Sequence, residues 1–185
     1  MKIITISGKA KHGKDTLGAM IKKEIESVGN RVLIFHYADY LKHICKQYFG
    51  WNGEKDDTGR TILQEIGTDI VRKRDPNFWV NTACRFFEMF NNKFDVIIVP
   101  DCRFPNEIQV PEQNYCFEVI SLYVTRYNKN HILFDNGLKE EQKQHLSECA
   151  LDDYRFDYYI DNDGSLEDLQ DKANYFVDCY GLTGF

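Results

Sequence analysis

Two glycines and a lysine near the N-terminus have the residue types and spacing of a phosphate site. The β-branched run Lys2–Ser7 is followed by a loop bracketed by Gly8 and Gly13, then by Lys14 and a helix-forming run, Leu17–Val28. This order is typical of a phosphate-binding loop. The glycines let the backbone curl with its N–H groups pointing inward, and the following helix adds a partial charge of about +0.5 at its N-terminus. The segment therefore predicts a site for a nucleoside triphosphate or a similar phosphate ester.

The residues after the lysine depart from the usual pattern of such loops. A Ser or Thr hydroxyl commonly follows the lysine and meets Mg²⁺, whereas here Asp15 comes first and Thr16 second. Either Thr16 takes that duty, or Asp15 holds the ion through its carboxylate or a water molecule. A third metal candidate is Asp101, which ends the apolar run Asp95–Asp101 as the acidic residue of a Walker B strand would.

Three arginines are candidates for contact with phosphate groups. Arg103 follows Asp101 at the same strand end, Arg72 lies in a cationic stretch, and Arg126 opens a polar segment. A guanidinium binds phosphate through two parallel hydrogen bonds, and a mobile arginine can neutralise the charge that develops in phosphoryl transfer. We expect Lys14, Arg103 and Arg126 to act in catalysis. The alternatives are that Arg103 and Asp101 satisfy a turn and each other, and that Arg72 is a solvated surface charge.

Other residues have less specific patterns. His12 favours packing or donation of a hydrogen bond, His145 has no evident partner, and Trp79 is more typical of a core anchor than of a base-stacking platform. The segment 162–165 either contacts adenine or is a plain turn followed by a helix cap at Ser165.

Strands that alternate with helices would position these residues. Strand-like runs occur at Lys2–Ser7, Arg31–Tyr37, Asp95–Asp101, Phe117–Thr125 and Tyr158–Asp161. The helical patterns between them have apolar stripes: Leu17, Met20, Ile21, Ile25 and Val28; Ile62, Ile66 and Ile70; Trp79, Ala83, Phe86, Phe87 and Phe90; and Leu166, Leu169, Ala173, Phe176 and Val177. The alternation predicts an α/β fold with a parallel sheet covered on both faces, and with ligands beyond the carboxyl ends of its strands.

Two stretches exceed what simple connections need. Residues 38–94 are mostly helical, and residues 126–146 are polar with little periodicity. On the ligand side of such a sheet, long excursions commonly close over substrates. We expect a single domain, 1–185, with 38–94 as a helical insertion and 126–146 as a lid-like segment.

Size and composition exclude several classes of protein. The chain has 185 residues, of which 43% are apolar and 14% aromatic, as in a globular domain. No apolar run approaches the roughly 20 residues of a membrane span, and the N-terminus lacks the pattern of a secretion signal. Six cysteines without Cys-x-x-Cys spacing indicate reduced thiols, and the net charge of −6 disfavours broad binding to nucleic acid or membrane. These features predict a cytoplasmic protein.

Taken together, these motifs resemble those of the phage-type deoxynucleoside monophosphate kinases. The resemblance rests on Gly8–Thr16, Leu63–Asp69 with Arg72 and Trp79, Asp101–Glu107, His145–Glu148 and Asp157–Gly164, which follow the family's order over nearly the whole chain. Its most specific parts are Gly-Lys-Asp-Thr and Asp-x-Arg-Phe-Pro-Asn-Glu.

This resemblance implies a P-loop NTPase three-layer fold of the nucleoside monophosphate kinase type, with a five-stranded parallel sheet in the order 2-3-1-4-5. It also implies Mg²⁺ and ATP, a deoxynucleoside monophosphate as acceptor, and a possible homodimer. ATP would lie against Gly8, Lys11, His12, Gly13, Lys14, Asp15, Thr16, Asn162 and Gly164. The acceptor would lie against Asp39, Lys42, Gln64, Arg72 and Arg103. Two alternatives stay open: a kinase of the same fold for dephospho-coenzyme A or phosphomevalonate, and a nucleotide-binding sensor without catalysis.

Overall fold

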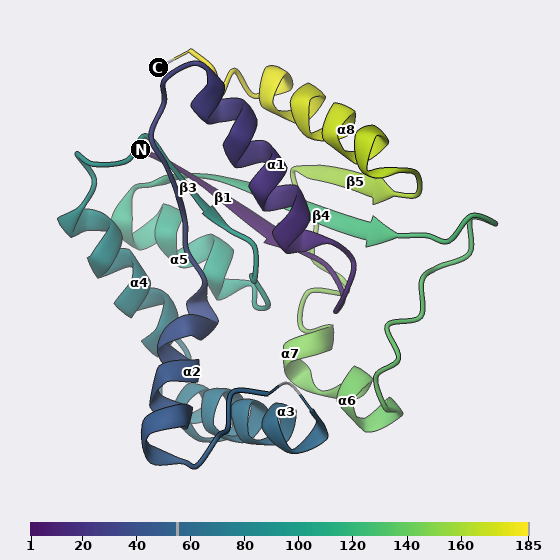
Figure 1. The fold of residues 1–185 in the computed structure, drawn as a ribbon. Coiled ribbons are helices and arrows are strands. Elements are labelled where there is room, and N and C mark those ends of the chain that lie inside the picture. Colours follow the sequence, from purple (N-terminus) through teal and green to yellow (C-terminus); the bar gives the residue numbers. More distant parts are fainter. Residues whose placement is uncertain (55, 185) are drawn as a thin grey trace.

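A five-stranded parallel sheet forms the centre of the protein, in a computed structural model that describes residues 1–54 and 56–184 (Figure 1). Its strand order is β2-β3-β1-β4-β5, which confirms the predicted sheet. The strands are β1 (Lys2–Ser7), β2 (Val32–Ile34), β3 (Val96–Val99), β4 (Glu118–Arg126) and β5 (Tyr158–Asn162).

Two strands are shorter than the apolar runs that predict them. The second run was expected to extend over Arg31–Tyr37, but β2 ends at Ile34, and Tyr37 begins the next helix, α2 (Tyr37–Tyr48). β2 ends before the predicted residue because the first backbone N–H groups of α2 bind a side chain that follows β3, the neighbouring strand. The N–H groups of Tyr37 and Ala38 donate to the two carboxylate oxygens of Asp101, at 2.9 and 3.0 Å. The carboxylate of Asp101 thus caps the N-terminus of α2, and residues 35–37 do not continue β2.

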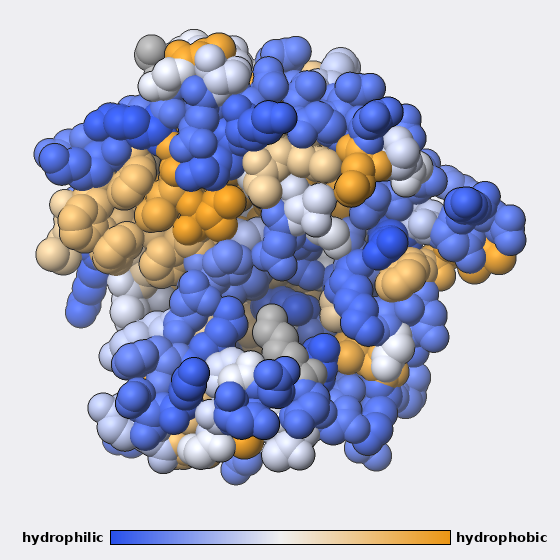
Figure 2. All heavy atoms as spheres, viewed as in Figure 1, coloured by the Kyte–Doolittle hydropathy of each residue, from blue (hydrophilic) through white to orange (hydrophobic). Residues whose placement is uncertain are grey.

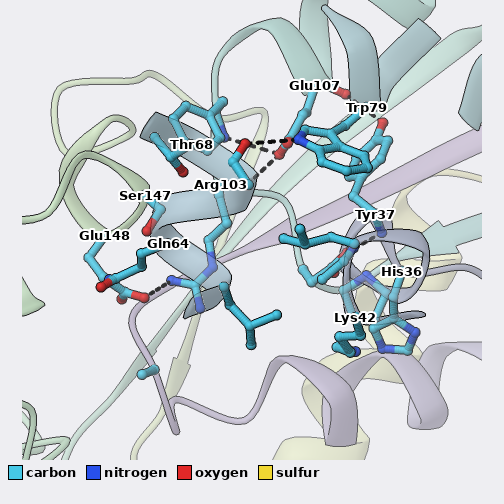
Figure 3. Close-up of a pocket in the computed structure, with 18 of the residues that line it drawn as sticks. His36, Tyr37, Lys42, Gln64, Thr68, Trp79, Arg103, Glu107, Ser147 and Glu148 are labelled. Atoms are coloured by element: carbon cyan, nitrogen blue, oxygen red, sulfur yellow. Dashed lines mark hydrogen bonds and ion pairs between the residues drawn. The ribbon is translucent and has the colours of Figure 1, made fainter. Parts of the chain in front are cut away.

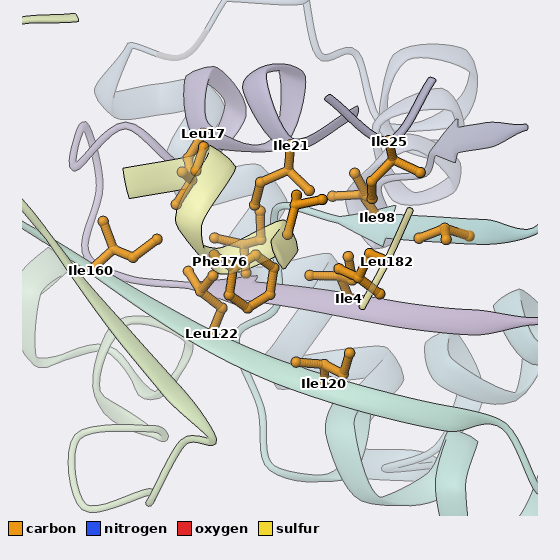
Figure 4. Close-up of a cluster of buried hydrophobic side chains, with 14 of the residues drawn as sticks. Ile4, Leu17, Ile21, Ile25, Ile98, Ile120, Leu122, Ile160, Phe176 and Leu182 are labelled. Carbon is orange, nitrogen blue, oxygen red and sulfur yellow. The ribbon is translucent and has the colours of Figure 1, made fainter. Parts of the chain in front are cut away.

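One face of the sheet is covered by α1 (Lys14–Ser27) and α8 (Leu166–Cys179), which pack side by side (Figure 1). Side chains alternate between the faces of a strand, so Ile4 and Ile6 of β1 point to this side. There they meet fully buried residues of both helices, among them Leu17, Ile21, Ile25, Leu169 and Phe176 (Figure 4). The predicted cap of α8 is confirmed, because the Ser165 side chain accepts a hydrogen bond from the N–H of Asp168. Leu166, by contrast, is 68% exposed, so the predicted stripe of α8 is wrong at its first member.

The opposite face is covered by α4 (Phe78–Met89) and α5 (Asn106–Tyr115). The alternate residues of the strands point here: Ile3 of β1, and Ile97 and Val99 of β3. They pack against Val80, Ala83, Cys84 and Phe87 of α4 and Val110 of α5. Phe86 is 38% exposed, so the buried stripe of α4 differs from the prediction at that position.

The insertion 38–94 also contains α3 (Asp57–Gln64) and the π-helix η1 (Glu65–Arg72). Together with α2 they enclose a separate apolar cluster of Cys45, Trp51 and Ile66, with Leu41, Ile62, Leu63 and Val71 packed against it. The predicted stripe of Ile62, Ile66 and Ile70 is wrong at its last member, since Ile70 is 51% exposed. A π-helix bonds residue i to residue i+5, which brings Val71 instead onto the face of Ile66 and buries Arg72 beside Gly67.

After β4, a loop leads to two short helices, α6 (Glu140–Gln144) and α7 (Leu146–Cys149). This segment reaches the insertion, because Lys139 Nζ and Gln142 Nε2 both contact the carboxylate of Asp57 on α3, at 2.5 and 3.3 Å. The two excursions predicted from the sequence are therefore in contact across the carboxyl edge of the sheet.

The surface carries both apolar and polar side chains, which gather in different places. Apolar side chains gather over α4 on the face shown in Figure 2, whereas polar side chains predominate over the lower part of that face. Within the part of the chain that the structure describes, no helix has the length and apolar character needed to cross a membrane.

Candidate active site

The loop between β1 and α1 has the backbone conformation that the glycine pattern predicts. Gly8 and Gly13 have φ angles of 143° and 97°, and Lys11 is also left-handed at 64°. Gly8 lies so close to β4 that a Cβ there would run into the carbonyl oxygen of Val124. Only glycine therefore fits at Gly8, for reasons of both conformation and space.

The N-terminus of α1 is open toward this loop. Gly13 is its N-cap, and no side chain among the described residues caps the first turn, which begins at Lys14. The first N–H groups of a helix are a natural partner for an anion. Asn162, at the end of β5, braces the loop by donating from Nδ2 to the backbone oxygen of His12 at 3.1 Å.

His12 faces away from the anion site. It is buried, and its Nδ1 accepts a hydrogen bond from the backbone N–H of Arg126 at 3.2 Å. Burial lowers the pKa of His12, and the charge of Lys14 lowers it further. The imidazole is thus packed in the interior, as the sequence favoured, and its Nδ1 is an acceptor that joins the loop to the end of β4.

Lys14 is folded onto its own loop. Its Nζ donates to the backbone oxygens of Gly8 at 2.7 Å and Lys9 at 2.9 Å, and the residue is only 8% exposed. Burial lowers its pKa to about 7, with a further contribution from the charge of Arg103. An anionic group at the loop would favour the charged ammonium, so this lysine is set to respond to phosphate.

A cavity of about 670 Å³ opens beside Lys14, beyond the carboxyl ends of β1 and β3 (Figure 3). It is bounded by the phosphate loop, α2, η1, the turn after β3 and α7. Eight of the residues predicted for the site line it: Lys11, Lys14, Asp15, Lys42, Gln64, Arg72, Asp101 and Arg103. Segments far apart in the sequence thus meet at one place, as the rule for parallel sheets predicts.

Arg103 points across the cavity toward α7 (Figure 3). Its Nη1 lies 2.7 Å from Oε1 of Glu148, a carboxylate whose side chain is 8% exposed. The alternative in which Arg103 pairs with Asp101 is therefore not what the structure has, because both oxygens of Asp101 accept the N–H groups that begin α2.

Two acidic side chains near the loop, Asp101 and Asp15, differ in burial and in their hydrogen-bond partners. Burial raises the pKa of Asp101, although the two backbone N–H groups oppose that shift. Asp15 lies 3.1 Å from Nε2 of His36, and this hydrogen bond raises the pKa of the imidazole. His36 also lies 3.7 Å from Asp39, which in turn pairs with Lys42 at 2.6 Å.

Arg72 is buried rather than solvated. Its Nη2 lies 2.6 Å from Oε1 of Glu107, its Nη1 donates to Pro76 O and Asn106 Oδ1 at 3.1 and 3.2 Å, and its guanidinium lies 3.8 Å over the ring of Phe104. Within the described residues its Nε has no hydrogen-bond partner. Most of its donors therefore hold the wall of the cavity together.

Trp79 is a core anchor that also lines the cavity. It is 5% exposed, and its Nε1 donates to the oxygen of Gly67 at 3.0 Å, as a core anchor would. One side of the indole nevertheless lines the cavity. Leu41 and Leu63 add apolar surface to the same wall.

Several predicted residues are not brought to the cavity. Gly8, His12, Gly13, Thr16, Asp39, Arg126, Asn162 and Gly164 are not among the described residues that line it. The guanidinium of Arg126 lies 4.3 Å over the ring of Phe134, and its Nη1 donates to Lys11 O at 3.4 Å. Arg126 is thus held against the phosphate loop and Phe134, and it does not line the cavity with Arg103.

Sequence reasoning missed four groups in this region: His36, Tyr37, Glu107 and Glu148. His36 follows β2, and its position at a strand's carboxyl end was the signal that could have found it. Glu107 and Glu148 fall within the quoted motifs but have no periodic or spacing signature of their own. His145, for which no partner was evident, accepts from the N–H of Ser147 at 3.2 Å and lies 3.8 Å from Asp69.

The sheet order and this loop give the chain the fold of the P-loop kinases. Solved structures with the same architecture include the APS kinase of Mycobacterium tuberculosis in complex with AMPPNP and APS, with a TM-score of 0.52 at 10% identity over 97% of both chains. The shikimate kinase of Aquifex aeolicus aligns with a TM-score of 0.50 at 12% identity over 98% of this chain and 99% of that one.

Within this class, a family model described as deoxynucleotide monophosphate kinase matches residues 32–173. The deoxynucleotide monophosphate kinase of Enterobacteria phage T4 is 30% identical over 115 residues, which are 61% of this chain and 42% of that protein. The enzyme of the same name from Escherichia phage RB69 is 29% identical over the same shares. The aligned region thus spans less than half the length of these curated relatives. The chain belongs to the deoxynucleotide monophosphate kinase family.

Proposed function

We propose that this protein transfers the γ-phosphoryl group of ATP to a deoxynucleoside 5′-monophosphate. A phosphate oxygen of the acceptor attacks the γ-phosphorus, the bond from that phosphorus to the β,γ-bridging oxygen breaks, and a deoxynucleoside diphosphate and ADP result. One observation carries the proposal: Lys14, at the start of α1, and Arg103, in the turn after β3, line one cavity of about 670 Å³ beside the open N-terminus of α1. Family membership agrees with it.

The donor end of the site is the phosphate loop. The N–H groups at the start of α1 and the Lys14 ammonium supply positive charge for the β- and γ-phosphates. Lys14 must leave the carbonyl oxygens of Gly8 and Lys9 to reach them, and the phosphates replace those two hydrogen bonds. The AMPPNP bound to the APS kinase neighbour fits an adenine nucleotide as donor.

The acceptor end lies between Arg103 and the insertion. Arg103 offers its guanidinium to the acceptor phosphate, while Lys42 and Gln64 line the same cavity. Leu41, Leu63 and Trp79 provide an apolar wall for the base and sugar. Because three of the five N–H donors of Arg72 bind protein groups, we assign Arg72 chiefly to holding this wall, and its Nε is a donor left for a ligand.

The residues present fit a Mg²⁺ ion held mainly by substrate phosphates. Asp15 and Asp101 line the cavity and are hard oxygen donors, with Thr16 in the same turn as Asp15. No group of three acidic, histidine or cysteine ligands forms among the described residues, which suits an ion that keeps several waters. When bound, Mg²⁺ would neutralise charge on the β- and γ-phosphate oxygens.

The two excursions have corresponding roles in this proposal. Residues 38–94 hold the monophosphate, and residues 126–146 close over the donor so that water is excluded.

We also propose a homodimer and a cytoplasmic location. Sedimentation velocity of the purified chain tests the first, and fractionation of the producing cells tests the second.

The decisive experiment is a coupled ADP-release assay with ATP. The acceptor panel contains all common nucleoside and deoxynucleoside monophosphates, together with dephospho-coenzyme A and phosphomevalonate. We expect ADP release that depends on one or more deoxynucleoside monophosphates, with the diphosphate as product. Release with another acceptor alone would assign a different kinase activity, and ATP binding without transfer to any acceptor would indicate a sensor.

A further inference from the structure

Glu148 is a carboxylate that faces the cavity from α7 (Figure 3). One oxygen, Oε1, is 2.7 Å from Nη1 of Arg103, and the side chain is only 8% exposed. The other oxygen, Oε2, has no hydrogen-bond partner among the described residues. Glu148 was not a predicted site residue, and the reaction proposed above assigns it no step.

An ion pair of this kind is not built for stability. Burying a carboxylate costs several kcal/mol unless its lone pairs are satisfied, and removal from water of one oxygen without a donor adds to that cost. A short helix at the edge of a ligand cavity is a poor place for such a group on structural grounds alone. The arrangement is better explained by what it does to Arg103.

The charges around Glu148 support this view. Lys14 and Arg103 are cations that line the same cavity, and the charge of Arg103 lowers the pKa of Lys14, whereas the charge of Glu148 raises it. Glu148 therefore offsets the repulsion between two cations that must both be near the cavity before phosphate arrives.

The α7 segment is itself fastened to the phosphate loop. Lys9 Nζ donates to the backbone oxygen of Glu148 at 2.6 Å and pairs with the carboxylate of Asp152. On the other side, the backbone N–H of Arg103 donates to Glu107 at 2.7 Å. The guanidinium of Arg103 is thus held between a fixed backbone and a fixed carboxylate.

We propose that Glu148 is a positioning residue, which orients the Arg103 guanidinium so that its other N–H donors face the acceptor phosphate. A guanidinium carries five N–H donors in one plane, so a single bond at Nη1 sets the direction of the rest. This inference rests on the proposed kinase function. Glu148 acts through Arg103 and takes no part in proton or phosphoryl transfer.

The test combines kinetics with binding for the full chain and the variants Glu148→Ala, Glu148→Gln, Arg103→Met and the double variant Arg103→Met with Glu148→Ala. With the best deoxynucleoside monophosphate from the acceptor panel, Glu148→Ala is expected to raise the KM and the Kd of the acceptor about tenfold or more, as loss of a charged hydrogen bond does. The KM for ATP should stay within about twofold. Glu148→Gln keeps an oxygen for Arg103 and should lose less.

The double variant separates positioning from an independent role. If Glu148 acts through Arg103, the double variant should bind the acceptor no more weakly than Arg103→Met alone, within about twofold. Glu112→Gln, which makes the same change as Glu148→Gln on the exposed side of α5 and away from the cavity, is the matched control and should match the wild type.

Three results would overturn the proposal. The first is that Glu148→Ala binds the acceptor as tightly as the wild type does. The second is that the losses in acceptor affinity of the two single variants multiply in the double variant, and the third is that Glu148→Ala raises the KM of both substrates in parallel and lowers the Tm. Glu148→Gln decides the same points if Glu148→Ala does not fold. Isothermal titration with the acceptor alone distinguishes the two proposals: a wild type that binds the acceptor without transferring phosphate sinks only the kinase function, and a wild type that binds none sinks both.

Discussion

The carboxylate of Glu107 lies 2.6 Å from the guanidinium of Arg72 and ties the insertion to the first turn of α5. Its other oxygen accepts the backbone N–H groups of Arg103 and Phe104 at 2.7 and 3.2 Å. Burial raises the pKa of Glu107, against the effect of Arg72. One buried carboxylate therefore fixes both the turn that carries Arg103 and the wall that carries Arg72.

Replacement of Glu107 by Gln should destabilise the protein by about 3–5 kcal/mol, because it leaves the Arg72 charge buried without its counter-charge. Urea unfolding followed by circular dichroism measures the free energy. Glu112→Gln on the exposed side of α5 is the control and should stay within about 0.5 kcal/mol of the wild type. A Glu107→Gln protein as stable as that control would contradict the prediction.

Lys14→Ala should lower kcat by about two to three orders of magnitude without unfolding the chain, because it removes a cation aimed at developing charge. The coupled ADP-release assay measures kcat, and circular dichroism checks the fold. Lys23→Ala, on the exposed face of α1, should keep full activity. Near-normal turnover by Lys14→Ala would refute the assignment of the phosphate loop.

The pKa of Lys14, lowered to about 7, predicts how stability depends on pH. Between pH 7 and the ordinary lysine pKa of 10.5, the unfolded chain keeps a proton that the folded chain has lost. The free energy of unfolding of the wild type should therefore rise with pH in this window, relative to Lys14→Met, by at most about 1.4 kcal/mol per pH unit. Urea titrations of both proteins from pH 6 to about 9.5 measure it; two parallel curves would show that Lys14 titrates normally.

Gly8→Ala should weaken ATP binding and lower the Tm more than Gly29→Ala does. Both glycines have positive φ angles, 143° and 90°, so both variants carry backbone strain. Only at Gly8 does the new methyl group meet the carbonyl oxygen of Val124, while nothing lies within 4 Å at Gly29. Differential scanning calorimetry with and without ATP separates the two effects, and equal losses in the two variants would be inconsistent with a close approach at Gly8.

Arg103→Met should reduce kcat/KM for the acceptor more than Arg126→Met does, because only Arg103 lines the cavity among these two. Arg126 lies over Phe134 behind the loop, so its loss should act mainly on the KM for ATP. Steady-state kinetics with each substrate varied in turn test this order. A larger loss from Arg126→Met would mean that the lid-like segment moves far enough to bring Arg126 to the reacting phosphates.

The sheet and the phosphate loop could be predicted because their signals are local. β-branched runs such as Lys2–Ser7 favour strands, and Gly8, Gly13 and Lys14 specify a loop conformation within a few residues. The ends of the strands follow no such local signal. β2 stops at Ile34 because Asp101, far along the chain, accepts the first N–H groups of α2.

Side-chain partners across the cavity were beyond the reach of sequence patterns. The α-helical period placed Ile70 inside and left open that Arg72 is a solvated surface charge, but the π-helix turns Arg72 toward Glu107 instead. The pairing of Arg103 with Glu148 joins residues from separate excursions whose approach depends on the whole fold.

The apolar cluster of Cys45, Trp51 and Ile66 is separate from the two clusters that cover the opposite faces of the sheet. Leu41 and Leu63, which line the cavity, pack against this separate cluster. The shape of that wall can therefore be altered by repacking the insertion, while the packing of the central sheet is left as it is.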